Sequence, residues 1–356
     1  MTFFKRSLIF TSFFIVCIFL LHFQPSSFQI PTNGPTSLLA FSSRIQYFHN
    51  PAAPRFLSSS LGTLGRLGNH IFEFASLYGL SKQLNRIPVF WVEDGTYREM
   101  LEYTRQIVPG LVDKFTVFKG KVPSHVVPTK FHPKSRIYDN PERLKSINDE
   151  YLHLTGHFYQ SWKYFPNHRD EIRSYLKPQK EFKTLPESDE NMHVTCIHTR
   201  RTDFVKVGFY ATDPDFVRSS VKLIHQIENQ KHNLKLVTVM FGDDPQFMKD
   251  IFPDAVFSNA PDSEVSSTTV HFISSNSPSD DLLYSSQHCD TVLISAPSST
   301  FGWWLGYLSK GNRVFFLDVT TVSDGLYKAG KFKPDDYFLP EWTALKFKAS
   351  PRQSDP

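Results

Sequence analysis

The second half of this 356-residue chain alternates between two kinds of segment. Short apolar runs rich in β-branched residues are separated by longer stretches in which apolar residues recur at helical spacing. The apolar runs are residues 193–199, 234–241, 269–273, 290–295 and 313–319. Strands that alternate with helices are typical of a parallel sheet with helices on its faces. The sequence therefore predicts a doubly wound α/β domain over residues 186–350.

Helix signals lie between these apolar runs. Residues 213–230 place most of their apolar side chains on one helical stripe, and the segment 245–252 begins with a proline in the first turn. The segment 277–289 has acidic residues in its first turn, and we expect Ser279 to cap that helix. Residues 298–311 begin with hydroxyl side chains and end at a glycine, which predicts one more helix.

The first half is less regular. It predicts a strand just before residue 60, a glycine-rich loop, a helix over 69–84, a strand at 87–92 and a further strand and turn within 150–165. The polar segment 177–191 is typical of a linker. We therefore expect two Rossmann-like domains, 59–185 and 186–350, that face each other across a cleft.

The N-terminus carries a membrane signal. Residues 7–23 contain no Asp, Glu, Lys or Arg, and Lys5 and Arg6 precede them. The positive-inside rule then predicts a cytoplasmic tail at 1–6 and a transmembrane signal anchor at 7–23. A cleaved signal peptide is the alternative, but no small-x-small cleavage site follows the apolar run. The stretch 24–58 is rich in proline and serine and is typical of an extended stem.

Three cysteines are too few for a disulfide framework. Cys17 lies within the apolar N-terminal run, whereas Cys196 and Cys289 each lie in an apolar context of the second half. We expect these two to be separate buried thiols, with a disulfide between them as the alternative.

The segment VTCIHTRRTDF ends a predicted strand with charged residues. Ligands of such sheets bind beyond the carboxyl ends of the strands, and Arg200 and Arg201 lie at this position. Two guanidinium groups beside a helix N-terminus can clamp a pyrophosphate, with Asp203 orienting one of them. A purely structural salt bridge is the alternative. The net charge of +4, without any basic block, argues against a nucleic-acid surface and favours one local anion site.

A glycine-rich loop, GTLGRLGNH, leads into the first predicted helix. Gly62, Gly65 and Gly68 let backbone approach a ligand, and Asn69 is a candidate helix cap. The loop matches neither a P-loop nor the strict dinucleotide-binding pattern. A tight turn that packs the helix on a strand is the alternative.

A third candidate segment, SAPSSTFGWW, follows the strand at 290–295. Ser298, Ser299 and Thr300 present hydroxyl groups at the same edge of the sheet, although helix capping alone needs only one of them. We expect the tryptophan pair to lie in the core. Adjacent acids at 243–244 and 280–281 lack the D-x-D spacing, and no H-E-x-x-H or C-x-x-C motif occurs, so we expect no metal.

Together these motifs resemble the galactoside α-1,2-fucosyltransferase family, which is glycosyltransferase family 11. The resemblance is carried, over about residues 60–345, by GRLGNHIFEFASLYGLSKQLNR, HTRRTDF, DDLLYSSQHCDTVLISAPSSTFGWWLGYLSKG and KPDDYFLPEW. It implies a single-pass type II Golgi membrane enzyme of the two-domain GT-B kind. Such an enzyme transfers L-fucose with inversion from GDP-fucose to the 2-hydroxyl of a galactose on a glycan, and it needs no metal.

The resemblance also implies roles for individual residues. Arg200 and Arg201 would hold the donor pyrophosphate, and His198 and Asp203 would shape that site. The remaining donor-binding residues would be Ser299, Thr300, Phe301, Gly65 and Asn69. The general base stays unassigned.

The sequence departs from the family pattern at two positions, and two alternative functions remain. The family often has Gly where Thr202 stands and Gln where His70 stands, and His70 leaves the acceptor open. A luminal sulfotransferase would want a phosphate-binding loop with a lysine, which GTLGRLGNH lacks. A non-catalytic glycan-binding relative is the other alternative, and the intact arginines argue against it.

Overall fold

The computed structural model describes residues 53–131, 135–182, 184–230, 234–261, 266 and 268–348. From Ala53 onward the chain forms one compact unit. The predicted cytoplasmic tail, signal anchor and most of the stem lie outside the described residues. Across the described ranges, the structure contains no helix with both the length and the apolar character needed to cross a membrane.

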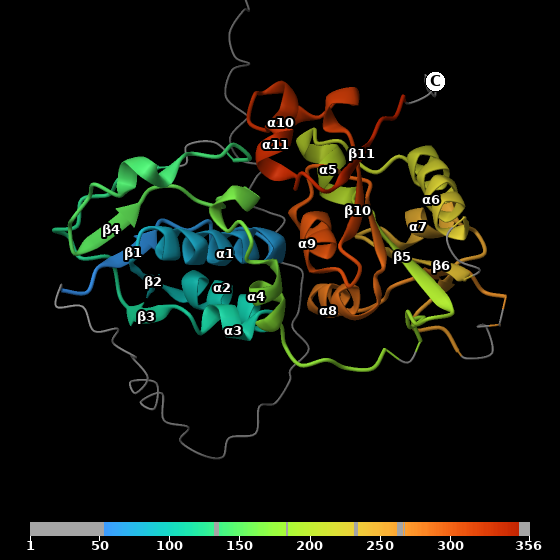
Figure 1. Ribbon diagram of the computed structural model, residues 1–356, viewed down its shortest axis with the longest axis horizontal. Coiled ribbons are helices and arrows are strands. Elements are labelled where there is room, and N and C mark those ends of the chain that lie inside the picture. The colour runs from blue at the N-terminus through green and yellow to red at the C-terminus, as the bar shows by residue number, and fades with distance from the viewer. Residues whose placement is uncertain are drawn as a thin grey trace, which may run out of the picture. The chain divides into compact units, whose positions relative to one another are not determined.

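The first half contains a four-stranded parallel sheet in the order β3-β2-β1-β4 (Figure 1). Its strands are β1 (Phe56–Ser59), β2 (Ile87–Val92), β3 (Thr116–Lys119) and β4 (Tyr151–Leu154). Its helices are α1 (Leu67–Gln83), α2 (Gly95–Arg105), α3 (Pro109–Val112) and α4 (Arg169–Ser174), with 3-10 turns η1 (Pro141–Leu144) and η2 (Trp162–Tyr164). The predicted strands and long helix are confirmed, but α1 begins before Asn69, and the extended residue that precedes it is Arg66.

The second half contains a seven-stranded parallel sheet in the order β11-β10-β9-β5-β6-β8-β7. Its strands are β5 (Met192–His198), β6 (Lys235–Phe241), β7 (Val256–Phe257), β8 (His271–Ile273), β9 (Thr291–Ile294), β10 (Arg313–Leu317) and β11 (Thr343–Leu345). All five predicted strands are confirmed. The two edge strands β7 and β11 were not predicted, since runs of two or three residues carry no periodic signal.

Within the described residues, the helices of the second half include one at each of the four positions where the sequence shows helix signals (Figure 1). They are α5 (Thr202–Val207), α6 (Pro214–Asn229), α7 (Pro245–Ile251), α8 (Pro278–His288), α9 (Thr300–Leu308), α10 (Gly325–Lys328) and α11 (Pro334–Tyr337), with the 3-10 turn η4 (Val319–Thr321). The prediction that Ser279 caps α8 was wrong, because Ser277 is the cap and accepts from the Asp280 amide. Pro278 explains the difference: it lacks an N–H and has the φ of a first helical residue, so the cap lies just before it.

The two halves share one hydrophobic core. The ring of Phe72 on α1 lies 4.5 Å from that of Trp303 and 5.0 Å from that of Trp304, both on α9. The Trp304 indole donates to the Gly68 carbonyl at 2.9 Å. The predicted core position of the tryptophan pair is confirmed. Because α1 is buried from its first turn onward, it fixes the glycine-rich loop against the start of α9.

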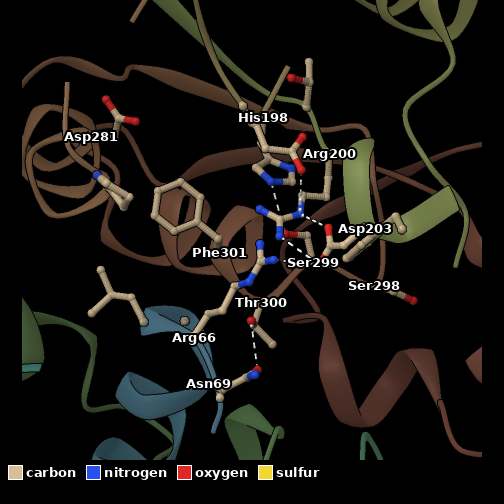
Figure 2. A pocket seen from close by; sticks show the side chains of 18 of the residues that line it. Arg66, Asn69, His198, Arg200, Asp203, Asp281, Ser298, Ser299, Thr300 and Phe301 are labelled. Atoms are coloured by element: carbon tan, nitrogen blue, oxygen red, sulfur yellow. Dashed lines mark hydrogen bonds and ion pairs between the residues drawn. The ribbon is translucent and has the colours of Figure 1, made fainter. Parts of the chain in front are cut away.

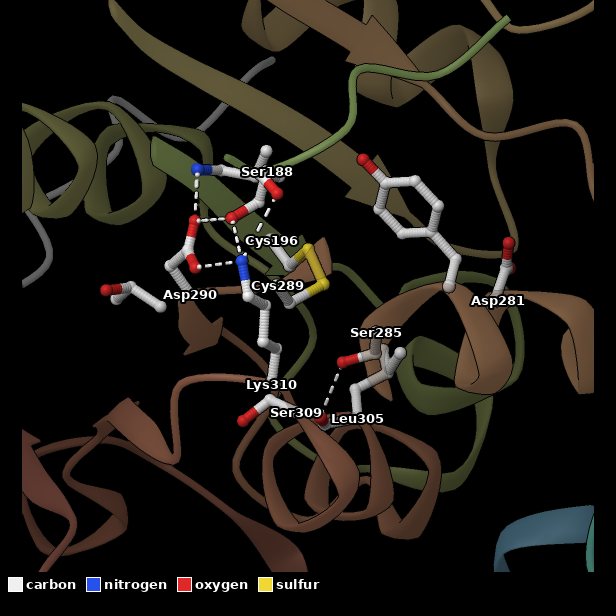
Figure 3. Close-up of a disulfide and its surroundings, with 12 residues drawn as sticks. Ser188, Cys196, Asp281, Ser285, Cys289, Asp290, Leu305, Ser309 and Lys310 are labelled. Carbon is white, nitrogen blue, oxygen red and sulfur yellow. Dashed lines mark hydrogen bonds and ion pairs between the residues drawn. A yellow bond between two sulfur atoms is a disulfide. The ribbon is translucent and has the colours of Figure 1, made fainter. Parts of the chain in front are cut away.

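Cys196 and Cys289 form a disulfide, so the expectation of two separate thiols was wrong (Figure 3). Cys196 lies on β5, and Cys289 follows α8 directly before the neighbouring strand β9. Their Cα atoms are 5.5 Å apart, which is an ordinary disulfide separation. The two residues lie 93 positions apart in sequence, and only the pairing of β5 with β9 brings them together.

Candidate functional site

A cavity of about 770 Å³ lies where the glycine-rich loop meets the carboxyl edge of the second sheet. The loops after β5, β6, β8 and β9 line it on one side, and the start of α1 lines it on the other. The sequence predicted a ligand site at this edge, and the structure places a cavity there. The predicted residues that line it are Gly65, Gly68, Asn69, His198, Arg200, Asp203, Ser298, Ser299, Thr300 and Phe301. Figure 2 labels all of them except the two glycines.

Arg200 is held in the cavity by carboxylates. Its Nε and Nη2 donate to the two oxygens of Asp203 at 2.8 and 3.0 Å, and Nε also lies 3.2 Å from Oδ2 of Asp243. Only 14% of the side chain is exposed. A guanidinium fixed in this way needs little reorganisation to meet an anion, because its rotamer freedom is already lost.

Arg201 lies differently from its neighbour. Its guanidinium carbon lies 4.6 Å from the centre of the Phe247 ring, and it is not among the residues that line the cavity. Its backbone amide donates to Oδ1 of Asp243 at 2.9 Å, and that carboxylate also accepts from the Thr202 hydroxyl. The structure therefore does not bring the two predicted arginines together; it places one in the cavity and stacks the other on an aromatic ring.

Sequence reasoning missed two further arginines in the cavity. Arg66, from the glycine-rich loop, places Nη2 3.2 Å from Oδ2 of Asp203. Arg136 is buried and donates to the Ser298 carbonyl at 2.5 Å. Arg66 lies in the GRLGN motif, of which only the glycines and the asparagine were considered as site residues. Nothing in the sequence around Arg136 points to the site. Both lie in the first half, so the cavity draws cations from both halves.

His198 is buried at the end of β5, and its Nε2 lies 3.1 Å from the hydroxyl of Ser299. That serine caps α9 by accepting from the Gly302 amide. Burial lowers the pKa of His198 to about 4, although the Asp243 charge opposes the effect, so the imidazole is neutral at physiological pH. A Cβ on Gly302 would lie 2.6 Å from Nδ1 of His198, so only glycine permits this approach. His198 therefore orients the start of α9.

Asn69 connects the two halves at the site instead of capping α1. Its Oδ1 accepts from the Thr300 hydroxyl at 3.1 Å and from the Gln160 amide at 2.8 Å (Figure 2). A Cβ on Gly68 would lie 2.8 Å from backbone and side-chain atoms of Thr300 and Phe301. The GN pair of the loop thus sets the close contact between α1 and α9.

Two buried acids near the cavity were also missed. Asp281 lines the cavity and accepts from the Ser274 hydroxyl at 2.5 Å; burial raises its pKa to about 8, so it is protonated at neutral pH. Glu73 on α1 lies below the glycine-rich loop and accepts from the amides of Gly62 and Phe158 at 2.8 and 2.7 Å. Burial raises the pKa of Glu73 to about 7.

The charges in the cavity favour an anion. Three arginines, Arg66, Arg136 and Arg200, line the cavity beside Asp203, Asp243 and Asp281. Burial raises the pKa of Asp281 to about 8, so this carboxyl is protonated at neutral pH and the arginines outnumber the other two acids. Within the described part of the chain, no group of three His, Cys, Asp or Glu side chains is placed to hold a metal ion.

The chain is similar to proteins of one known family. The model of glycosyl transferase family 11 matches residues 60–346. A Caenorhabditis elegans protein named "Putative galactoside 2-alpha-L-fucosyltransferase svh-11" is 46% identical over 298 residues, covering 82% of this chain and 80% of that protein. Another, named "Galactoside 2-alpha-L-fucosyltransferase", is 32% identical over 305 residues, covering 79% and 75%. The solved structure of the NodZ alpha-1,6-fucosyltransferase soaked with GDP-fucose aligns with a TM-score of 0.43 at 12% identity, over 77% of this chain and 97% of that one. The family match spans most of the chain, and the chain therefore belongs to glycosyl transferase family 11.

Proposed function

We propose that this chain is a galactoside α-1,2-fucosyltransferase. It transfers L-fucose with inversion from GDP-fucose to the 2-hydroxyl of a galactose on a glycoprotein or glycolipid glycan. One observation carries the proposal: in a family 11 chain, a cavity lined by three arginines lies at the carboxyl edge of a parallel sheet, with Arg200 fixed inside it. The names of the nematode relatives support the same reaction.

The donor chemistry assigns a role to Arg200. Breaking the bond between fucose C1 and its phosphate oxygen builds negative charge on the leaving diphosphate. A cation held by Asp203 and Asp243 stabilises that charge more in the transition state than in the ground state. The reaction then needs no metal ion, because the fixed guanidinium supplies the positive charge that a metal cation would otherwise supply. Ser299 and Thr300, at the start of α9, add hydroxyl groups beside the same leaving group.

Arg201 is proposed as a mobile partner of this site. The described structure gives its guanidinium no carboxylate partner, only the ring of Phe247. It follows Arg200 directly in the chain, so a change of rotamer is the movement that we propose brings it toward a bound diphosphate. Asp203, which already holds Arg200 and meets Arg66, is then an orienting group.

We further propose a GT-B arrangement with the first half, 59–185, on the acceptor side and the second half, 186–350, on the donor side. The uncharged run at 7–23 behind Lys5 and Arg6 supports a type II signal anchor in the Golgi membrane. The buried Cys196–Cys289 disulfide supports a luminal catalytic part, since disulfides persist in oxidising compartments.

Nucleotide binding by the full-length protein in mild detergent separates this function from its alternatives. Thermal unfolding is measured with GDP, GDP-fucose and a phosphosulfate nucleotide, each in EDTA. We expect GDP and GDP-fucose to raise the melting temperature, and Arg200→Lys to reduce the effect because lysine cannot form the two parallel bonds to Asp203. Stabilisation by the phosphosulfate nucleotide alone would favour a sulfotransferase. GDP binding without turnover would favour a glycan-binding relative.

A further inference from the structure

A second hollow, of about 440 Å³, lies beside the donor cavity between the glycine-rich loop and α2. It is lined by Thr63, Gly65, His70, Thr96, Glu99, Met100, Glu102, Tyr103 and Gln106. Gly65 and Tyr103 line the donor cavity as well, so the two hollows are neighbours. The hydroxyl of Thr96 donates to that of Thr63 at 3.3 Å and connects α2 to the loop. A ligand in this groove therefore lies next to whatever occupies the donor cavity.

His70 is the buried polar group of this groove. Only 4% of the residue is exposed, and neither ring nitrogen has a hydrogen-bond partner among the described residues. The carbonyls of Gly62 and Thr63 lie near enough to raise its pKa slightly, but neither meets hydrogen-bond geometry, and burial lowers the pKa to about 4. A neutral imidazole carries one donor and one acceptor, and leaving both unpaired in a buried site is costly. A polar ligand in the groove can pair with one of these nitrogens.

The remaining groove residues indicate the chemistry of that ligand. Glu99 and Glu102 are exposed carboxylates on α2, and Gln106 and Thr96 add neutral polar groups. Two carboxylates accept hydrogen bonds from hydroxyl groups and repel phosphate or carboxylate ligands. The ring of Tyr103, an exposed residue beside His70, offers an apolar face to both hollows. Carboxylates, an amide and an aromatic face together suit an uncharged, hydroxyl-rich ring.

We propose that this groove binds the acceptor, with the terminal β-galactoside ring between Glu99, Glu102 and His70 and its reacting hydroxyl toward the donor cavity. This proposal rests on the proposed fucosyl transfer. His70 acts as a specificity-determining residue that pairs with a hydroxyl of the acceptor. The carboxylates of Glu99 and Glu102 repel the anionic donor, so they favour the uncharged acceptor in this groove.

Steady-state kinetics of the full-length protein in mild detergent test the proposal, with methyl β-D-galactopyranoside as the acceptor. Glu99→Gln and Glu102→Gln keep side-chain size and helix propensity but remove the charge. We expect either change to raise the KM for the galactoside about tenfold, because a hydrogen bond to a charged group is lost. The KM for GDP-fucose and the rate of acceptor-independent GDP-fucose hydrolysis should stay within about twofold. Glu142→Gln, an exposed acid of η1 outside both hollows, is the matched control.

His70 gives a second, independent test. His70→Phe keeps an aromatic ring without nitrogens and should raise the galactoside KM, whereas His70→Gln, which keeps a donor and an acceptor, should restore part of the loss. Melting temperatures in GDP check that both variants are folded. An unchanged galactoside KM in all four groove variants would overturn the proposal. Absence of transfer by the wild-type protein, despite stabilisation by GDP, would overturn the proposed function and this inference with it.

Discussion

Glu73, which binds the glycine-rich loop, should make the stability of the protein depend on pH. Its carboxylate is fully buried on α1, and Oε1 accepts from the amides of Gly62 and Phe158. Burial raises its pKa from 4.5 to about 7, against the smaller opposing effect of the two amides. Between pH 4.5 and pH 7, Glu73 therefore binds more protons in the folded protein than in the unfolded chain. Its stabilisation from this group is full below about pH 4.5 and is lost as the pH rises through 7.

The size of the effect follows from the two pKa values. A rise from 4.5 to about 7 corresponds to about 3 kcal/mol of unfolding free energy lost between pH 4.5 and pH 8. Glu73→Gln keeps an oxygen acceptor for both amides but does not ionise. Its amide nitrogen takes the place of Oε2, which has no partner in the described residues, and this costs about 1 kcal/mol at every pH.

Urea unfolding of wild type and Glu73→Gln, monitored by tryptophan fluorescence at pH 5 and pH 8, tests the prediction. From pH 5 to pH 8, the unfolding free energy of the variant should rise by about 2–3 kcal/mol relative to that of wild type. Comparing two proteins matters because burial lowers the pKa of His70 and His198, and these groups change stability in the opposite direction as pH rises toward 6.5. A difference between variant and wild type that is the same at both pH values would refute the reasoning.

Three further predictions follow from the site and the disulfide. Gly302→Ala should destabilise the protein by about 2 kcal/mol and weaken GDP-dependent stabilisation, because the added Cβ would lie 2.6 Å from Nδ1 of His198; a thermal melt with and without GDP checks both effects. Cys196→Ser with Cys289→Ser should lower the unfolding free energy by about 2–5 kcal/mol, and dithiothreitol should lower the stability of wild type but not of the double variant. Since His198 is neutral above about pH 5, His198→Asn should leave the shape of the pH–rate profile between pH 5.5 and pH 8 unchanged while lowering its height.

The fold could be predicted from the sequence where local patterns are strong. The apolar runs of β5, β6, β9 and β10 are buried on both faces, and such runs are readable without tertiary information. The disulfide could not be predicted, because it depends on which strands become neighbours. The boundaries of the two domains stay a prediction.

The candidate site was predictable where one motif supplies both the residue and its place on the sheet edge. His198 ends β5, Arg200 follows two residues later, and Ser299 caps α9, so position relative to the strands locates them. Arg136 and Asp281 were missed because they reach the cavity from separate segments whose approach only the packing determines. The direction of Arg201 could not be predicted either, since its contact with Phe247 depends on where α7 packs.

The linkage of the product tests the central claim most directly. Full-length protein in mild detergent is incubated with GDP-fucose and methyl β-D-galactopyranoside in EDTA, and the product is analysed by nuclear magnetic resonance. We expect one disaccharide, with α-linked fucose on O2 of the galactose, and its loss in Arg200→Ala. A product linked at another hydroxyl, or undiminished transfer by Arg200→Ala, would contradict it.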